Sequence, residues 1–200
     1  ADQGHAEALY NLGIAFAKGD GVEKNAEQAL KLFKMAADQG LPRAQYRLGL
    51  CYGRGNGVEP SDTEGALWVK KAAEQGYALA HHRLGQLYRS GKGVNQSDAE
   101  SIKYFTKAAE QGNVDAMVEL ASAYHLGRGV AVSGSKAFSW YKKAADKGNA
   151  NALYSLGLMY ESGRGVKQSL PDAINYYKQA AKKNHQAATS ALNRLDIKSL

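Results

Sequence analysis

Small and large apolar residues recur along the chain at helical spacing, and the same order of residues returns every 36 positions. Near the start, four of them lie at i, i+4, i+7 and i+8, the spacing of one face of a helix: Ala8, Leu12, Ala15 and Phe16. A second set has the same spacing: Ala29, Phe33, Ala36 and Ala37. The pattern predicts two amphipathic helices in each copy, helix A over about residues 6–18 and helix B after it, with these residues facing the core.

Glycines and N-cap residues mark the ends of these helices. Gly19 and its equivalents follow helix A and predict a left-handed C-terminal cap, and a second glycine two positions later lets the chain turn sharply. Gly40 and its equivalents end helix B. A column of N-cap residues predicts where helix B begins, with Gln28, Glu64 and Glu100 as the second half of a capping box: Asn25, Ser61, Ser97, Ser133 and Ser169.

The copies divide the chain into five full repeats and a partial sixth: residues 1–36, 37–72, 73–108, 109–144 and 145–180, then 181–200. Helices of about 13 residues are marginal alone in water, so each pair has to bury its apolar face against the next pair. The sequence therefore predicts an all-α fold, a right-handed α/α superhelical solenoid of antiparallel helix pairs, with residues 1–200 as a single repeat array. Leu192, Leu195 and Ile197 predict a last helix that caps the array.

The repeat resembles that of a known family. Helix A contains Leu48-Gly49-x-x-Tyr52, the loop contains Gly55-x-Gly57-Val58, and helix B contains Lys70-Lys71-Ala72-Ala73. These motifs are similar to those of the tetratricopeptide superfamily, whose period is 34, and the two extra loop residues resemble its Sel-one-like repeat branch. The match covers the whole chain. It departs at Ala121, which replaces a glycine, at Phe16, which replaces a tyrosine, and in the eroded sixth copy.

The resemblance implies an adaptor that holds another protein, without a cofactor and without enzymatic activity. Members of the family assemble complexes, often at membranes, and bacterial members face the cell envelope or a host, which favours a periplasmic or secreted location over a cytoplasmic one. A secreted, cysteine-rich subgroup is linked to β-lactam binding, but Cys51 is the only cysteine of this chain. The chain begins where a helix B normally ends, at Ala1–Gly4, so we expect it to be a segment of a longer array.

Comparison of the copies predicts which surface binds a partner. The positions that vary lie on the side of helix A opposite the uniform ones, and in tetratricopeptide-like arrays helix A lines the concave groove. The second and third repeats are basic there. We expect this groove to bind a protein or peptide with an acidic or carboxylate-bearing segment, through Arg43, Tyr46, Arg47, Leu50, His82, Arg83, Gln86 and Arg89. The alternative is that these arginines pair with Asp115, Glu119 or neighbouring repeats and only solvate the surface.

The charge of the chain leaves a second hypothesis open. Twenty-six Lys and Arg residues against 19 Asp and Glu give a formal charge of +7, spread thinly and largest in the last 20 residues. Nucleic-acid binders concentrate such charge on one face. Binding of nucleic acid through dispersed basic residues is therefore the weaker alternative, with the tail as its main candidate: Lys182, Lys183, Arg194 and Lys198. Exposed ends of the array also leave self-association open.

Neither catalysis nor metal binding has a supporting motif. The glycine tetrads do not extend to a nucleotide-binding loop, and the adjacent His81 and His82 point about 100° apart on a helix, so they cannot reach one ion. Cys51 shares a column with apolar residues, which favours a buried structural thiol. The aromatic column on helix B predicts packing, although it could also form a stacking ladder: Trp68, Tyr104, Trp140 and Tyr176. No apolar run reaches the length that crosses a bilayer. A β-lactam-binding enzyme is the remaining alternative, and it has no motif.

Overall fold

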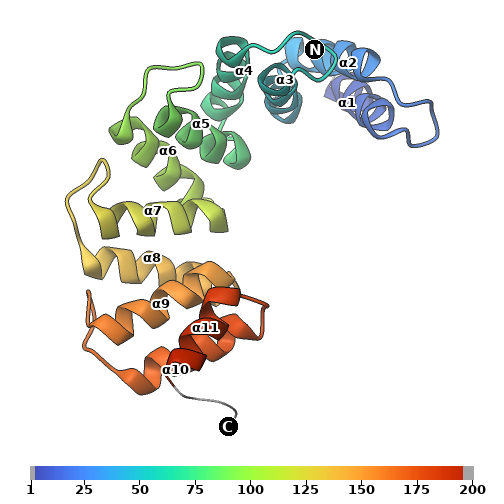
Figure 1. Ribbon diagram of the computed structural model, residues 1–200. Coiled ribbons are helices and arrows are strands. Elements are labelled where there is room, and N and C mark those ends of the chain that lie inside the picture. The colour runs from blue at the N-terminus through green and yellow to red at the C-terminus, as the bar shows by residue number, and fades with distance from the viewer. Residues whose placement is uncertain (1–2, 196–200) are drawn as a thin grey trace. The chain divides into compact units, whose positions relative to one another are not determined.

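The computed structural model describes residues 3–195, and within that range it contains helices and no strands (Figure 1). The described residues form the all-α fold of helix pairs that the repeat predicts. Ala1, Asp2, Ile197 and Lys198 lie outside them. The helices are α1 (Gln3–Lys18), α2 (Ala26–Asp38), α3 (Pro42–Arg54), α4 (Asp62–Glu74), α5 (Ala78–Ser90), α6 (Asp98–Glu110), α7 (Val114–Leu126), α8 (Gly134–Asp146), α9 (Ala150–Ser162), α10 (Leu170–Ala181) and α11 (Gln186–Arg194).

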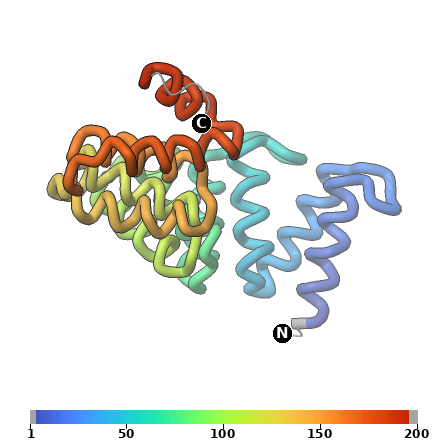
Figure 2. Tube along the Cα trace, turned by 90° about the horizontal axis from the view of Figure 1, so that it is seen from below, coloured from blue at the N-terminus to red at the C-terminus, as the bar shows by residue number. Residues whose placement is uncertain are grey.

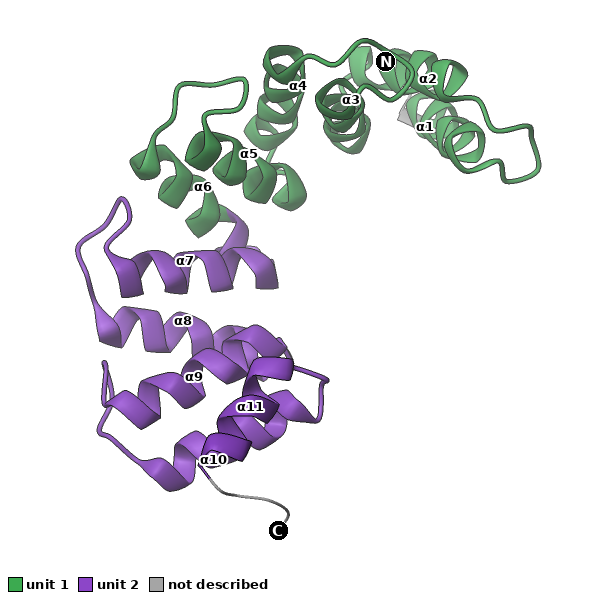
Figure 3. Cartoon of the chain, viewed as in Figure 1, with its two compact units in different colours: residues 1–107 green, residues 108–200 purple. Residues whose placement is uncertain are grey.

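The helices group into two compact units, unit 1 (residues 1–107) and unit 2 (residues 108–200), with the boundary inside α6 (Figure 3). Within unit 1, each of α1 to α4 packs on the next helix along the chain, and successive helices run in opposite directions (Figure 2). In unit 2, α7 to α11 pack in the same sequential way. The single array over residues 1–200 stays a prediction.

In four helix pairs a glycine on helix A lies against an apolar or aromatic side chain on helix B. A Cβ atom added at Gly13 would lie 2.7 Å from Cε1 of Phe33, and one added at Gly85 would lie 2.6 Å from Cδ1 of Phe105. Both phenylalanines are buried. Gly49 meets Val69 in the same way, and Gly157 meets Tyr177. The glycine column therefore sets how closely the two helices of a pair approach, because any larger residue would push the buried ring away.

The fourth repeat shows what happens when this glycine is replaced. Ala121 stands in the glycine column and is fully buried, and the helix B residue opposite it is Tyr141. Burial raises the pKa of Tyr141, and hydrogen bonds with Ser155 and Ser122 act in the opposite direction. The tyrosine ring is thus accommodated beside the extra methyl group, with its hydroxyl group among serines rather than in an apolar core.

The predicted alanine and leucine columns of helix A are buried in the second to fifth repeats but not in the first helix, and the aromatic column of Phe16 and Tyr52 is half-buried. Ala44, Leu48 and their equivalents in later repeats are fully buried, and Leu48 packs in a cluster with Ala36 and Ala37 of the preceding helix B. Leu12 occupies the same column, but its side chain is 44% exposed. The side chain of Ala8 is exposed as well, so the expectation that Ala8 and Leu12 face the core was wrong. The column packs against the preceding repeat, and α1 has no such neighbour in the described structure.

The second glycine of three loops, at Gly57, Gly93 and Gly165, brings neighbouring repeats together, whereas Gly21 in the first loop has no atom within 4 Å of an added Cβ atom. Gly57, at φ 75°, lies so close to the backbone of Ala26, in the first turn of α2, that a Cβ atom would overlap it. Gly93, at φ 71°, approaches the carbonyl group of Asp62 at the start of α4 in the same way. These glycines are thus required twice, for the left-handed backbone and for the contact with the preceding repeat. The sequence predicted only the first of these reasons.

The predicted N-caps of helix B are confirmed. The side chains of Ser61 and Ser97 accept hydrogen bonds from the backbone N–H groups of Glu64 and Glu100, both at 3.2 Å. The reciprocal half of the capping box is replaced by another contact. The backbone N–H group of Ser61 donates to the carbonyl oxygen of Tyr52, at 2.8 Å, so the N-cap residue also ties helix B to the end of helix A.

The glycine–aromatic contact gives a first prediction. We expect Gly85→Ala to destabilise unit 1 by about 1–2 kcal/mol, since overpacking of a filled core exceeds the gain in helix propensity. The matched control is Gly53→Ala in α3, where an added Cβ atom meets nothing within 4 Å. That variant should gain up to about 1 kcal/mol. Urea unfolding followed by circular dichroism measures both changes, and equal effects of the two substitutions would contradict the packing argument.

Candidate functional site

The eight residues predicted to bind a partner all lie on α3 and α5 of unit 1, and we call them the basic surface: Arg43, Tyr46, Arg47, Leu50, His82, Arg83, Gln86 and Arg89. The structure brings the two helices together at Tyr46. Burial raises the pKa of Tyr46, against the opposing effect of three nearby guanidinium groups, those of Arg83, Arg47 and Arg54. The Tyr46 ring also packs edge-on against Tyr77, with centroids 5.5 Å apart. An aromatic side chain therefore lies among several positive charges.

On α5 the basic surface contains a local hydrogen-bond cluster. Gln86 accepts a hydrogen bond from Nη1 of Arg83 at 3.2 Å, and its Nε2 lies 3.3 Å from Nε2 of His82. The rings of His82 and Phe105 lie 5.8 Å apart, and the Arg89 guanidinium lies 5.6 Å from the centre of the same ring. The hydrogen bonds among these side chains and their contacts with the Phe105 ring hold their polar ends in a defined arrangement.

Arg43 differs from the other arginines of the basic surface because it has partners in the neighbouring repeat. Its guanidinium forms an ion pair with Glu7 on α1 and lies over the Tyr10 ring, 4.6 Å from the ring centre. For Arg43 the structure therefore contains the alternative arrangement, in which the arginine pairs with a side chain of the neighbouring repeat. A ligand that used Arg43 would have to compete with Glu7.

A cavity of about 410 Å³ lies beside α1, α2 and α3 of unit 1, and we call it the unit 1 cavity. It contains Arg47 and Leu50 of the basic surface and adds positive charges that were not predicted as site residues. Lys18 ends α1, Lys24 lies in the following loop and Arg54 ends α3, so none of the three is at the centre of a helix. The lining residues are Ile14, Ala17, Lys18, Lys24, Ala26, Ala29, Phe33, Arg47, Leu50, Cys51, Arg54 and Asn56.

Cys51 is part of the inner wall of the unit 1 cavity. Its thiol is free and its side chain is buried. Burial raises the pKa of the thiol, and the nearby Arg47 and Arg54 act in the opposite direction. A buried thiol with a raised pKa is a poor nucleophile at neutral pH, so the packing role predicted for Cys51 fits its surroundings.

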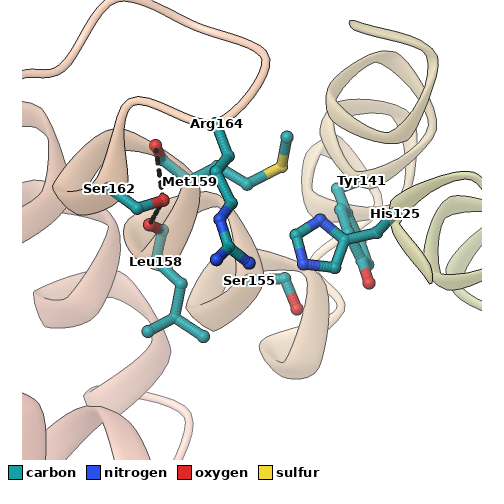
Figure 4. Close-up of a pocket in the computed structure, with 7 residues that line it drawn as sticks. All are labelled: His125, Tyr141, Ser155, Leu158, Met159, Ser162 and Arg164. Atoms are coloured by element: carbon teal, nitrogen blue, oxygen red, sulfur yellow. Dashed lines mark hydrogen bonds between the residues drawn. The ribbon is translucent and has the colours of Figure 1, made fainter. Parts of the chain in front are cut away.

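A second cavity, of about 280 Å³, occupies the equivalent place in unit 2, and we call it the unit 2 cavity (Figure 4). Its Tyr141 stands where the first has Phe33, and its Ser155 and Ser162 stand where the first has Arg47 and Arg54. The Arg164 guanidinium and the His125 imidazole face the same space (Figure 4). The lining residues are His125, Tyr141, Ser155, Leu158, Met159, Ser162 and Arg164.

The C-terminal helix α11 is joined to the rest of unit 2 by the partly buried carboxylate of Glu161. Tyr177 donates a hydrogen bond to Oε2 of Glu161 at 2.5 Å, and Nη2 of Arg194 donates to both carboxylate oxygens, at 2.6 and 2.8 Å. The Tyr177 hydrogen bond and the Arg194 charge lower the pKa of Glu161. Arg194, a member of the predicted basic tail, thus has an intramolecular partner, while Lys182 and Lys183 are exposed.

The aromatic column of helix B packs as predicted. Trp68 is buried, and the rings of Tyr104 and Tyr88 stack 5.5 Å apart within one repeat. His81 is buried beside Tyr104, whereas His82 lies on the neighbouring side of α5. Among residues 3–195 there is no group of three or more His, Cys, Asp or Glu side chains placed to hold a metal ion. In the same part of the chain, the helices are too short or too polar to cross a bilayer.

Comparison with known proteins identifies the repeat. The family model of the Sel1 repeat matches five consecutive segments that include most of the chain: residues 6–41, 42–77, 78–113, 114–149 and 150–185. No match was found among curated proteins.

Several solved structures have the same fold. A protective antigen present in uropathogenic Escherichia coli strains is 37% identical, with a TM-score of 0.90, over 92% of this chain and 39% of that one. The chain thus spans well under half of that antigen. A Sel1 repeat protein from Oxalobacter formigenes is 35% identical, with a TM-score of 0.87, over 96% of this chain and 79% of that one. An immunity protein from Pseudomonas aeruginosa, 24% identical with a TM-score of 0.55 over 92% of this chain and 67% of that one, shares the fold.

The carboxylate of Glu161 gives a second prediction. Its lowered pKa means that it stabilises the fold above the unfolded pKa of about 4.5, and that this contribution is lost as the pH falls through the lower folded value. We expect Glu161→Gln to lower the free energy of unfolding at pH 7 by about 1–2 kcal/mol, a value kept modest because Arg194 is largely exposed. The loss should shrink towards pH 3.

Urea unfolding at a series of pH values measures this difference. The control is Glu59→Gln, which removes an exposed loop carboxylate. That substitution should change the stability little at any pH. A Glu161→Gln loss that stayed constant from pH 7 to pH 3 would contradict the charge-based explanation.

Proposed function

The chain belongs to the Sel1 repeat family, whose members are in general non-enzymatic protein-interaction scaffolds, and we propose that it binds a partner protein through the basic surface of unit 1. The observation behind this proposal is the arrangement around Tyr46. An aromatic side chain, the apolar Leu50 and the guanidinium groups of Arg47 and Arg83 lie close together on two helices. Aromatic residues and arginines are enriched where proteins bind each other tightly.

The charge of this surface sets the chemistry of the partner. Carboxylate groups bind guanidinium groups through charge-assisted hydrogen bonds, worth about 1.5–3 kcal/mol each when water is excluded and about 0.2–1 kcal/mol when the pair is exposed. Micromolar affinity requires about 8 kcal/mol. Several arginines therefore have to act together with the apolar contacts of Tyr46 and Leu50, and the partner segment is acidic.

A bacterial envelope or host-facing role follows as part of this proposal. The E. coli relative at 37% identity is a protective antigen. This similarity supports a host-facing role for the chain. Nucleic-acid binding through the tail is less favoured, because Arg194 is engaged by Glu161.

Affinity capture with a matched pair of variants tests the proposal. Arg47→Gln with Arg83→Gln removes two positive charges from the basic surface. Lys31→Gln with Lys70→Gln removes the same charge from exposed positions on helices α2 and α4. Because the first pair touches the proposed binding surface, we expect it to reduce the yield of a captured partner at least tenfold.

The control pair should leave the yield unchanged, and circular dichroism checks that both variants fold. Binding should also weaken as salt is raised. A partner that binds both variants equally would place the interaction elsewhere on the chain and would contradict the proposed surface.

A further inference from the structure

We propose that the unit 1 cavity is an anchor site that takes one large apolar side chain of an acidic partner segment, next to a carboxylate bound by the surrounding cations. The inference rests on the proposed function and deepens it, because it names the place where the partner is held and the residue type that enters it. The cavity adjoins the basic surface and shares Arg47 and Leu50 with it.

The charged side chains around the cavity are all positive. Lys18, Lys24, Arg47 and Arg54 line it, and no acidic side chain does. Two of these cations lie at the end of α1 and in the loop after it, and the other two lie on α3. Within residues 3–195 none of the four is joined to an acidic side chain by an ion pair. A negatively charged ligand can therefore neutralise these four cations.

The floor of the cavity is apolar. The Phe33 ring, which Gly13 admits against helix α1, lies at the base of the cavity together with Ile14 and Leu50. A volume of about 410 Å³ is at the lower end of the range of about 300–1,000 Å³ that small-ligand sites occupy. One leucine-, methionine- or phenylalanine-sized side chain with its neighbouring backbone fits such a space, and its burial there removes apolar surface from water.

The unit 2 cavity shows which of these features come from the repeat itself. The repeat places both cavities at the same positions, but serines stand in unit 2 where unit 1 has Arg47 and Arg54. The floor of the unit 2 cavity is Tyr141, whose hydroxyl group is polar, and His125 projects from the position of Ala17. The repeat alone therefore creates the space. Leu158, Met159 and Arg164 also line the unit 2 cavity, so the larger number of cations is what distinguishes the unit 1 cavity.

The binding geometry follows from these residues. The apolar side chain enters between Ile14 and Leu50 and lies on Phe33. A carboxylate one or two positions away in the partner accepts hydrogen bonds from Arg47 or Arg54. The rest of the partner segment continues over Tyr46 towards Arg83, so the cavity fixes the register of the segment and the basic surface adds affinity.

Selection of peptides from a random phage-displayed library tests the proposal, with the intact chain as bait. Two pocket variants accompany the wild type. Ala17→Phe fills the cavity from a position that holds His125 in the fourth repeat, so the fold has room for a ring there. Lys18→Gln with Arg54→Gln removes two exposed cations and leaves the apolar floor intact. Lys31→Gln with Lys70→Gln is the charge-matched control.

We expect the wild type to enrich peptides with Asp or Glu within two positions of Leu, Ile, Met or Phe. The affinity of such a peptide should fall at least tenfold with Ala17→Phe and at least tenfold with the Lys18 and Arg54 variant, the loss expected for a charge-assisted hydrogen bond. The control should bind as the wild type does. Replacement of the apolar residue by alanine, or of the acidic residue by its amide, should weaken the peptide to a similar extent.

Other results overturn the proposal. Peptides without an acidic residue, no enrichment at all, or equal binding by wild type and Ala17→Phe would each show that the cavity does not anchor a partner. Binding of a fatty acid such as laurate, with no peptide enriched, would assign the cavity to an anionic lipid instead. The proposed function is tested separately, by the Arg47 and Arg83 variant in the capture experiment. That variant can lose the partner when Ala17→Phe does not, and the reverse, so the two failures can be told apart.

Discussion

The contact between a helix A glycine and a large helix B side chain is the constraint on which the rest of the structure depends. Gly13 and Phe33, and Gly85 and Phe105, bring two short helices close enough to bury each other's apolar faces. Since helices of this length are marginal alone, the pair is the unit that repeats, and neighbouring pairs stabilise one another by packing through the Leu48 column and the loop glycines.

The same contact creates the cavities. A helix B ring, Phe33 beside Gly13 in unit 1 and Tyr141 in the repeat of Ala121 in unit 2, forms the floor of a space that the next helix A closes from the side, so the two cavities occupy equivalent positions. What differs is the side chains around them. Arg47 and Arg54 in one unit, and Ser155 and Ser162 in the other, give the same space different chemistry. In such a repeat the buried columns determine the fold, and the remaining positions are free to determine the ligand.

Much of the fold could be predicted from the sequence, because five copies reveal which positions are uniform. The helix pairs, the Ser61 type of N-cap and the burial of the Leu48 column followed from spacing alone. Contacts between repeats could not be predicted, since no local pattern shows that Gly57 touches the preceding helix B or that Leu12 lacks a neighbour. At the site, spacing along helix A pointed to Arg47, but Lys18 and Lys24 join it only through the three-dimensional arrangement of a helix end and a loop.

The most direct test of this account is an experimental structure of the chain with a bound partner segment. The account predicts an apolar side chain of the partner in contact with the Phe33 ring, and a partner carboxylate within hydrogen-bond distance of Arg47 or Arg54. A partner seated on helix B or on the loops, with the unit 1 cavity filled only by solvent, would contradict the claim that the contact which builds the fold also builds the binding site.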